Sequence, residues 1–423
     1  MSNNGNGNLA QSAIATLTSH TRFEVSSTEM VVDEDPGNGR NGGRGGLDLS
    51  SPPVAAHTVT APSIHRMAAR HLVEALEPDR LARAKEGFST RRVPKSAMKT
   101  LVTGRLRFRA GDLVLARVER ILQHSRIELP SGRRSNLQLG WELILACGNR
   151  YASDQFEGLV PEKIGRAHLI AAGGVVAVEV ARARGIKHAT EIEILGAIGD
   201  KRGLPLNLMQ FALPQPIVHK PRPPIVAVFG SSMNSGKTTT ARLLVSGLIS
   251  GGFKVGYAKL TGTGAGGDYW SLVDAGAVVV DFTDAGLAST YKTPVSALEN
   301  ISLKLIGHLA NQGCDCIVVE IADGLLQQET AALMQSHIIH TLVDNVIFAA
   351  GDPLAAQGGV MMLRQAGFNV VGVAGLLTAS PLPTREAKEL MDVPVWLRED
   401  LLDTATAVSI ATRVDRVAEQ VLP

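Results

Sequence analysis

The feature that most constrains the fold is a short segment in the second half of the chain, positions 225 to 239. It reads IVAVFGSSMNSGKTT. The apolar run at 225–229 predicts a buried strand, because parallel strands covered on both faces are almost entirely apolar. Glycine and serine then let the backbone curl so that successive N–H groups point at an anion, and a following helix adds the partial positive charge of its N-terminus. The segment therefore predicts a phosphate-binding strand–loop–helix unit.

The residues of this loop are candidate nucleotide contacts. They are Gly230, Asn234, Ser235, Gly236, Lys237, Thr238 and Thr239. Lys237 is placed to reach the β- and γ-phosphates, and the Thr238 hydroxyl is placed to ligate Mg²⁺. Five residues separate Gly230 from Gly236, one more than in the usual pattern, and Ser231 stands where the first glycine is expected. The predicted ligands are ATP or GTP together with Mg²⁺.

Charged residues near the ends of two later apolar runs fit the same site. Glu320 follows the run at 316–319, and a carboxylate at that end of a buried strand is where Mg²⁺ or its water needs a ligand. Lys259, in the run at 254–260, would bring a second cation to the phosphoryl group being transferred. Asp268 follows a glycine-rich turn and could complete the magnesium shell. A surface lysine and a plain flexible loop are the alternatives for Lys259 and that turn.

These residues divide into two sets of roles. The candidate catalytic residues are Lys237, Lys259 and Glu320, and the candidate metal ligands are Thr238, Asp268 and Glu320.

With 423 residues, the chain is too long for one ordinary domain. The predicted parts are a disordered tail at 1–60, a helical lead-in at 61–96, a smaller and mainly β domain at 97–212, a Pro-rich linker at 213–223 and a P-loop domain at 224–423. The lead-in is predicted from apolar side chains that recur at helical spacing over 64–88. The tail is rich in Asn and Gly and cannot bury enough apolar surface to fold.

Alternating strand and helix patterns predict an α/β fold for the last part, with a doubly wound parallel sheet. Its predicted strands lie at 225–229, 254–260, 277–282, 316–322, 345–350, 370–377 and 393–396, and predicted helices at 239–250, 295–311 and 354–366. Short β-prone runs separated by turn residues predict an antiparallel barrel or sandwich before it. Those strands are predicted at 104–108, 113–122, 126–129, 142–147, 175–180 and 191–196.

Composition narrows the class of protein. The formal net charge is only +2, which argues against a nucleic-acid partner. Three cysteines cannot form a disulfide framework. The sequence contains no run of 18 or more apolar residues, so no membrane span is predicted. These features predict a cytoplasmic protein without a membrane partner, and they leave a homo-oligomer open.

Two further loops are candidate substrate contacts. The stretch 148–157 gathers six polar or charged side chains, which suits either a substrate loop or an ordinary solvated connection. The stretch 281–291 follows the third predicted strand, at the ligand edge of such a sheet. There, Asp284 or Ser289 is expected to contact substrate, with a capped turn as the alternative.

The five-residue gap, with Lys259 and Glu320 closing their strands, resembles the SIMIBI-class P-loop enzymes typified by dethiobiotin synthetase. The stretch around Asp268 is similar to the GTP-binding adaptor of molybdopterin-guanine dinucleotide synthesis. Residues 261–264 and the Glu320 strand are similar to the P-loop half of the D-glutamate N-acetyltransferase family. The resemblance covers about 224–400. It implies that Lys237 binds phosphate, that Lys259 stabilises the transition state, and that Thr238 and Glu320 bind the metal. Dethiobiotin synthetase reads adenine partly through an asparagine after a late strand, whereas the matching stretch here, 377–381, has no asparagine.

Together these features predict an enzyme that uses Mg-ATP to activate a small molecule, such as a carboxylate, by phosphoryl transfer before ligation. One alternative is a GTP- or ATP-dependent adaptor that binds a protein partner. The other is an acyltransferase whose P-loop holds the phosphates of coenzyme A.

Overall fold

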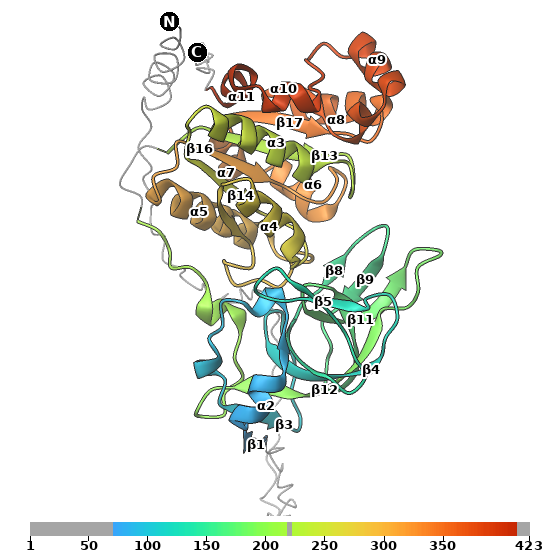
Figure 1. Cartoon of the computed structure of the whole chain (residues 1–423), viewed down its shortest axis with the longest axis vertical. Helices are drawn as coiled ribbons and strands as arrows, with labels where there is room; N and C mark the ends of the chain where they lie inside the picture. The colour runs from blue at the N-terminus through green and yellow to red at the C-terminus, as the bar shows by residue number, and fades with distance from the viewer. Residues whose placement is uncertain (1–70, 218–221, 413–423) are drawn as a thin grey trace, which may run out of the picture. The chain divides into compact units, whose positions relative to one another are not determined.

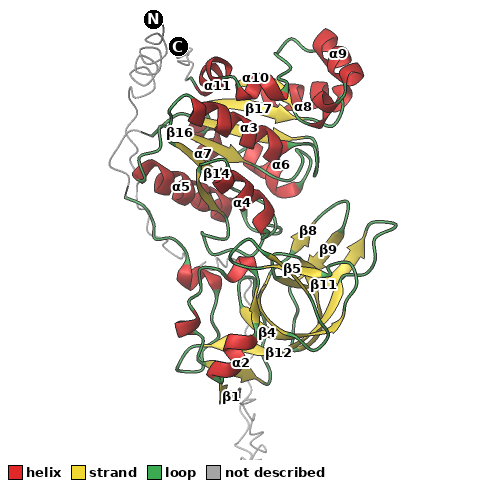
Figure 2. Ribbon diagram, in the orientation of Figure 1, coloured by secondary structure: helices red, strands yellow, loops and turns green. Residues whose placement is uncertain are grey.

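The computed structural model describes residues 71–217 and 222–412, which belong to one compact unit. The tail predicted at 1–60, the first part of the lead-in and part of the linker lie outside these ranges. Below, residues 71–217 are called the β half and residues 222–412 the P-loop half (Figures 1 and 2).

The β half is built on a ten-stranded sheet, with a separate two-stranded ribbon of β5 and β6. Its strands are β1 Leu72–Ala75, β2 Lys85–Glu86, β3 Thr100–Thr103, β4 Leu113–Arg120, β5 Arg126–Glu128, β6 Arg134–Asn136, β7 Glu142–Cys147, β8 Arg150–Tyr151, β9 Phe156–Leu159, β10 Gly165–Ala171, β11 Val175–Arg182 and β12 Thr190–Gly199. The main path runs β1-β3-β12-β4-β7-β11-β9-β8, with β10 beside β11 and β12 and β2 beside β7. The predicted mainly β class is confirmed.

Both faces of the central strands are buried. Along β4, Leu113 and Leu115 enter one core cluster, whereas Val114 and Ala116 enter another. This division follows from the alternation of side chains along a strand. The centre of the sheet is therefore packed on both faces.

The helical lead-in is wrong over its described part. Leu72–Ala75 is a strand that pairs antiparallel with Thr100–Thr103, and only Pro78–Arg83 (α2) is α-helical there. A proline disrupts a helix that contains it but suits the first helical turn, so a helix begins at Pro78 and does not run through it. The strand predicted at 104–108 is also wrong, because Gly104 has φ 95° and ends β3.

The P-loop half is a parallel sheet of six strands in the order β15-β14-β16-β13-β17-β18. They are β13 Ile225–Gly230, β14 Val255–Lys259, β15 Val278–Asp281, β16 Cys316–Glu320, β17 Asn345–Ala349 and β18 Val370–Ala374. The helices are α3 Lys237–Ser250, α4 Gly266–Asp274, α5 Val295–Asn311, α6 Gln328–Met334, α7 His337–Leu342, α8 Pro353–Gln365, α9 Pro381–Leu390, α10 Arg398–Leu402 and α11 Thr404–Ala411.

Helices cover both faces of this sheet (Figure 2). Val226 and Val228 of β13 pack in a cluster with residues of α3, α4, α10 and α11. Ala227 and Phe229 pack in a cluster with residues of α5 to α9. This arrangement confirms the predicted doubly wound α/β class.

The strand predicted at 393–396 is reduced to a single bridge, between Val395 and Val373. Pro394 has no N–H to donate, so the bridge consists of two bonds, in which Val373 N donates to the Pro394 carbonyl and Trp396 N donates to the Val373 carbonyl, each at 2.8 Å. Among the residues that the structure describes, none of the helices combines the length and apolarity needed to cross a bilayer.

Candidate functional site

The predicted phosphate-binding loop joins β13 to α3 by a tight turn. Gly236 has φ 99° and Asn234 has φ 64°, so both lie in the left-handed region, which glycine and asparagine tolerate best. A Cβ on Gly236 would lie 2.9 Å from Gly375 Cα, and one on Gly230 would lie 2.4 Å from Ser235 Oγ. The glycines are therefore required by both backbone shape and space.

Lys237 points back over this loop. Its side chain is buried, and Nζ donates to the carbonyl oxygens of Ser232, at 2.8 Å, and Asp323, at 2.7 Å. Burial is the largest influence and lowers the pKa of Lys237. Within the described ranges, no carboxylate forms an ion pair with this ammonium group, whose two acceptors are neutral. A phosphate oxygen would be a stronger, charge-assisted acceptor.

Glu320 is the most buried carboxylate of the site, with 1% of its surface exposed. Its Oε2 accepts a hydrogen bond from the Tyr257 hydroxyl at 2.8 Å, and its Oε1 accepts one from Thr238 Oγ1 at 3.3 Å. Lys259 Nζ lies 3.0 Å from Oε1. The parallel register explains this meeting, since Lys259 pairs with Glu320 and Glu320 pairs with Val228, just before the loop.

Asp268 reaches the same point from the first turn of α4. It forms an ion pair with Lys259, which thus bridges two carboxylates. Burial alone would raise the pKa of Asp268, but the charge and hydrogen bond of Lys259 lower it below its usual value. Burial alone would lower the pKa of Lys259, but the charges of Asp268 and Glu320 together raise it above its usual value. Lys259 and Asp268 are therefore both charged at neutral pH.

The donors around Thr238 fit a magnesium ion. The described residues contain no group of three His, Cys, Asp or Glu side chains arranged to hold a metal. Mg²⁺ does not need one, because it commonly uses one or two carboxylates, water and substrate phosphates. Thr238, Asp268 and Glu320 supply a hydroxyl and two carboxylates at one place. Lys259 now lies between the two carboxylates, so a metal there would compete with its ammonium group.

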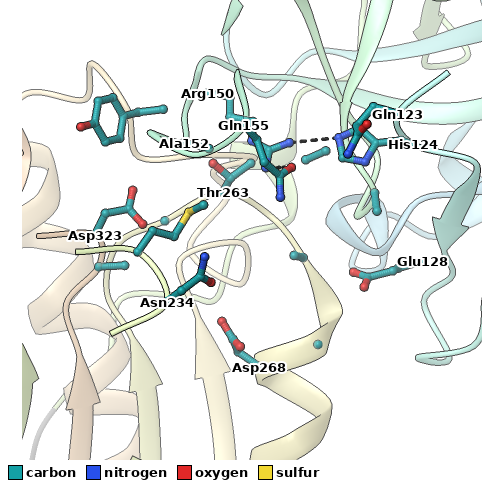
Figure 3. Close-up of a pocket in the computed structure, with 18 of the residues that line it drawn as sticks. Gln123, His124, Glu128, Arg150, Ala152, Gln155, Asn234, Thr263, Asp268 and Asp323 are labelled. Carbon is teal, nitrogen blue, oxygen red and sulfur yellow. Dashed lines mark hydrogen bonds between the residues drawn. The ribbon is translucent and has the colours of Figure 1, made fainter. Parts of the chain in front are cut away.

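A cavity of about 670 Å³ lies on one side of the phosphate-binding loop (Figure 3). The P-loop half contributes Met233, Asn234, Lys259, Gly262, Thr263, Ala265, Gly267, Asp268, Ala322 and Asp323, and the β half contributes Gln123, His124, Ser125, Arg126, Glu128, Arg134, Arg150, Tyr151, Ala152, Gln155, Ala171 and Ala172. The stretch 148–157, which suits either a substrate loop or a solvated connection, thus supplies part of the wall. Its Asp154 accepts a hydrogen bond from Asn234 Nδ2 at 2.8 Å, which ties the loop to the phosphate-binding turn.

A smaller cavity of about 190 Å³ also borders the loop. It is lined by Gly236, Thr239, Thr240, Leu243, Ala374, Gly375, Leu376, Thr378, Ala379, Trp396, Arg398 and Leu401. Ser235 lies between the two cavities in sequence; its hydroxyl is buried and has no hydrogen-bond partner among the described residues. Its carbonyl accepts from Leu376 N at 2.9 Å, which fixes the loop against the end of β18.

The structure places Asp284 and Ser289 away from both cavities. Asp284 pairs with Arg91 of the β half at 2.6 Å, and Arg91 also contacts Asp281 at 3.2 Å. Burial, and then the charge of Asp281, raise the pKa of Asp284 to about 6. Ser289 is buried, and its hydroxyl accepts from Tyr291 N at 3.3 Å. The expected substrate contacts are therefore packing and ion-pair residues that join the two halves.

Sequence reasoning missed most of the β-half wall. His124 lies in the connection between β4 and β5, Glu128 ends β5 and Arg150 begins β8, and no local motif marks them. The polar density of 148–157 was the one available signal, and it identified the region of Arg150 and Gln155 without assigning either residue.

No family model and no curated protein matches this sequence. Solved structures similar to the chain include the kinase domain of the Escherichia coli tyrosine kinase ETK, at 16% identity and TM-score 0.28 over 36% of this chain and 66% of that one. Another is the signal recognition particle 54 kDa protein from Aeropyrum pernix K1 in complex with GDP, at 22% identity and TM-score 0.28, over 40% of this chain and 39% of that one. A third is the septum site-determining protein MinD from Pyrococcus horikoshii OT3 complexed with Mg-ADP, at 20% identity and TM-score 0.30, over 46% of this chain and 97% of that one. The chain spans less than two thirds of the first two structures.

Proposed function

We propose that this chain binds a magnesium–nucleoside triphosphate at the phosphate-binding loop and uses it to phosphorylate a small carboxylate held in the larger cavity. The observation that carries the proposal is the position of the loop between two cavities. Gly236 lines the smaller cavity, whereas Met233 and Asn234 line the larger one. Triphosphate bound in the loop would thus have space for a nucleoside on one side and for a phosphate acceptor on the other.

The loop residues supply the phosphate site. Backbone N–H groups of the turn and the N-terminus of α3 attract the phosphates, and Lys237 exchanges its two carbonyl acceptors for phosphate oxygens. Thr238, Asp268 and Glu320 would hold Mg²⁺, which when bound supplies neutralising charge to the β- and γ-phosphates. Tyr257 fixes the Glu320 carboxylate by its 2.8 Å hydrogen bond. These groups bind and orient the triphosphate.

Lys259 supplies a second cation on the acceptor side. It lines the larger cavity and is partly exposed to it, with 15% of its side chain accessible. In the proposed reaction, a carboxylate oxygen bonds to the γ-phosphorus, the bond from that phosphorus to the β–γ bridging oxygen breaks, and nucleoside diphosphate leaves. Lys259 would neutralise charge on the group in transfer, as preorganised donors do in phosphoryl-transfer sites.

The larger cavity favours a small-molecule acceptor over a protein partner. Its volume falls within the range of small-molecule sites, and polar and titratable side chains from both halves line it. The smaller cavity combines the apolar Leu243 and Trp396 with the polar Thr378 and Arg398, a mixture suited to a nucleoside. Both ATP and GTP remain candidates for it.

A hydroxylamine-trapping assay tests this function. The protein is incubated with Mg-ATP or Mg-GTP and a series of small carboxylates, and an acyl phosphate is captured as a hydroxamate. We expect hydroxamate and nucleoside diphosphate in equal amounts, only when a carboxylate is present. Nucleotide consumption that requires a protein partner would instead identify an adaptor, and acyl transfer from coenzyme A without nucleotide consumption would identify an acyltransferase.

A further inference from the structure

The wall of the larger cavity that lies opposite the phosphate-binding loop contains a buried arginine with no counter-charge. Arg150 is 8% exposed and lines the cavity from β8 (Figure 3). Its Nη2 donates to Gln155 Oε1 at 2.9 Å, and its Nη1 donates to the carbonyl of Ile170 and lies 3.2 Å from His124 Nε2. All three partners are uncharged groups or, for His124, a ring that is neutral at pH 7.

The charge of Arg150 is not balanced by a direct ion pair. Among the residues that the structure describes, no carboxylate lies within ion-pair distance of it, and its buried Nε has no hydrogen-bond partner. The charges of Asp154 and Asp323 raise the pKa of Arg150 from a distance, without an ion pair. Burial lowers the pKa of Arg150 to about 10, so the group remains a cation at neutral pH. An unpaired buried cation is costly, and a bound anion would remove much of that cost.

The other charges of this wall are already balanced or solvated. Arg134 pairs with Glu128 at 2.9 Å, and Glu128 also accepts from Gly266 N at 2.6 Å. Arg126 is exposed to solvent. One buried unpaired guanidinium therefore remains, and it matches one negative charge. A carboxylate suits it better than a phosphate dianion, because a carboxylate carries a single negative charge and its two oxygens can accept from one edge of the guanidinium group.

We infer that Arg150 binds a carboxylate of the substrate, with Gln155 and the His124 ring holding the guanidinium in place. This assignment rests on the proposed function, in which the carboxylate that accepts the phosphoryl group faces Lys259. The carboxylate bound by Arg150 is therefore a second one, at the other end of the substrate. The substrate class is thus a small dicarboxylate, or a related molecule with two carboxyl groups. Arg150 is a specificity-determining residue and lies outside the phosphate site.

Thermal unfolding without nucleotide tests this carboxylate site independently of the proposed reaction. Wild type is compared with Arg150→Gln and with Arg166→Gln, which replaces an exposed arginine of β10 that does not line the cavity. The probes are acetate, butyrate, succinate and glutarate at constant ionic strength, with succinamide as the uncharged match for succinate. We expect the dicarboxylates to raise the Tm of wild type and Arg166→Gln by about 2–4 °C, and that of Arg150→Gln by much less.

Two further variants locate the anion. Arg150→Lys keeps the cation and should keep part of the shift, which preserves the comparison if Arg150→Gln does not fold. Lys237→Ala should keep the whole shift, because the phosphate-binding loop is a different site. The inference is overturned if succinamide acts as well as succinate, if no carboxylate shifts the wild type, or if Lys237→Ala loses the shift while Arg150→Gln keeps it. Nucleotide titrations of the same preparations show separately whether the proposed function fails.

Discussion

The ammonium group of Lys259 lies 3.0 Å from the Glu320 carboxylate, at the ends of two neighbouring parallel strands. The same ammonium group is paired with Asp268, so one lysine holds both carboxylates that are expected to serve a metal ion. This bridge gives the cluster a built-in cation before any nucleotide binds. Binding of a metal there requires Lys259 to loosen at least one of these pairs and turn toward the phosphates.

Replacing Lys259 separates catalysis from nucleotide binding. We expect Lys259→Ala to keep nucleotide affinity within a few-fold and to lose kcat by about 100- to 1000-fold, because its charge is needed mainly when charge develops in transfer. Single-turnover measurement of nucleoside diphosphate checks the rate, and calorimetry checks binding. Equal losses in both would place Lys259 in ground-state binding instead.

Tyr257 is expected to position Glu320. Its hydroxyl is fully buried and donates to Oε2, and burial, followed by the charge of Glu320, raises its pKa well above the usual value, so it stays protonated. We expect Tyr257→Phe to weaken the apparent Mg²⁺ affinity by about 10- to 100-fold, and to cost about 1–3 kcal/mol of folding stability because a buried carboxylate oxygen loses its donor. A magnesium titration of turnover, with Tyr269→Phe as the matched control, checks this; an unchanged magnesium dependence would contradict it.

The fold of the P-loop half could be predicted because its signals are local. The apolar run, the small-residue loop and Lys237 are adjacent, and parallel strands bring Lys259 and Glu320 to one sheet edge by rule. The β half offered no such rule. Leu72–Ala75 becomes a strand only through its pairing with Thr100–Thr103, which a local helical pattern cannot reveal. The cavity wall likewise needs Arg150 and Asn234, far apart in sequence, to meet in space.

His124 predicts a loss of stability in mild acid. Burial, and then the charge of Arg150, lower its pKa from 6.5 to about 4. Between these values the unfolded chain binds a proton that the folded chain does not, so falling pH favours unfolding. We expect wild type to lose up to about 3 kcal/mol more than His124→Gln over this interval. Denaturant unfolding at a series of pH values measures this difference in the free energy of unfolding. The same pH dependence of that free energy in both proteins would contradict the prediction.

Arg91 is predicted to hold the two halves together. Its side chain is 10% exposed, contacts Asp281 and Asp284, and lies over the rings of Phe88 and Tyr269. We expect Arg91→Met to cost about 3–5 kcal/mol, because Asp281 is left buried without an ion-pair partner and Asp284 keeps only its longer pair with Arg92, at 3.5 Å. The control is Arg202→Met, at an exposed pair. Adding Asp284→Asn should restore part of the loss; no recovery would show that packing alone was removed.

The most direct test of the central claim is calorimetry of Mg-ATP and Mg-GTP binding to wild type and Lys237→Ala. Lys388→Ala, at an exposed position of α9, is the control. We expect at least one nucleotide to bind wild type and the control alike, and Lys237→Ala to lose about 100-fold or more in affinity, because it removes charge-assisted contacts to phosphate. Normal binding by Lys237→Ala would contradict the assignment of this loop as the phosphate site.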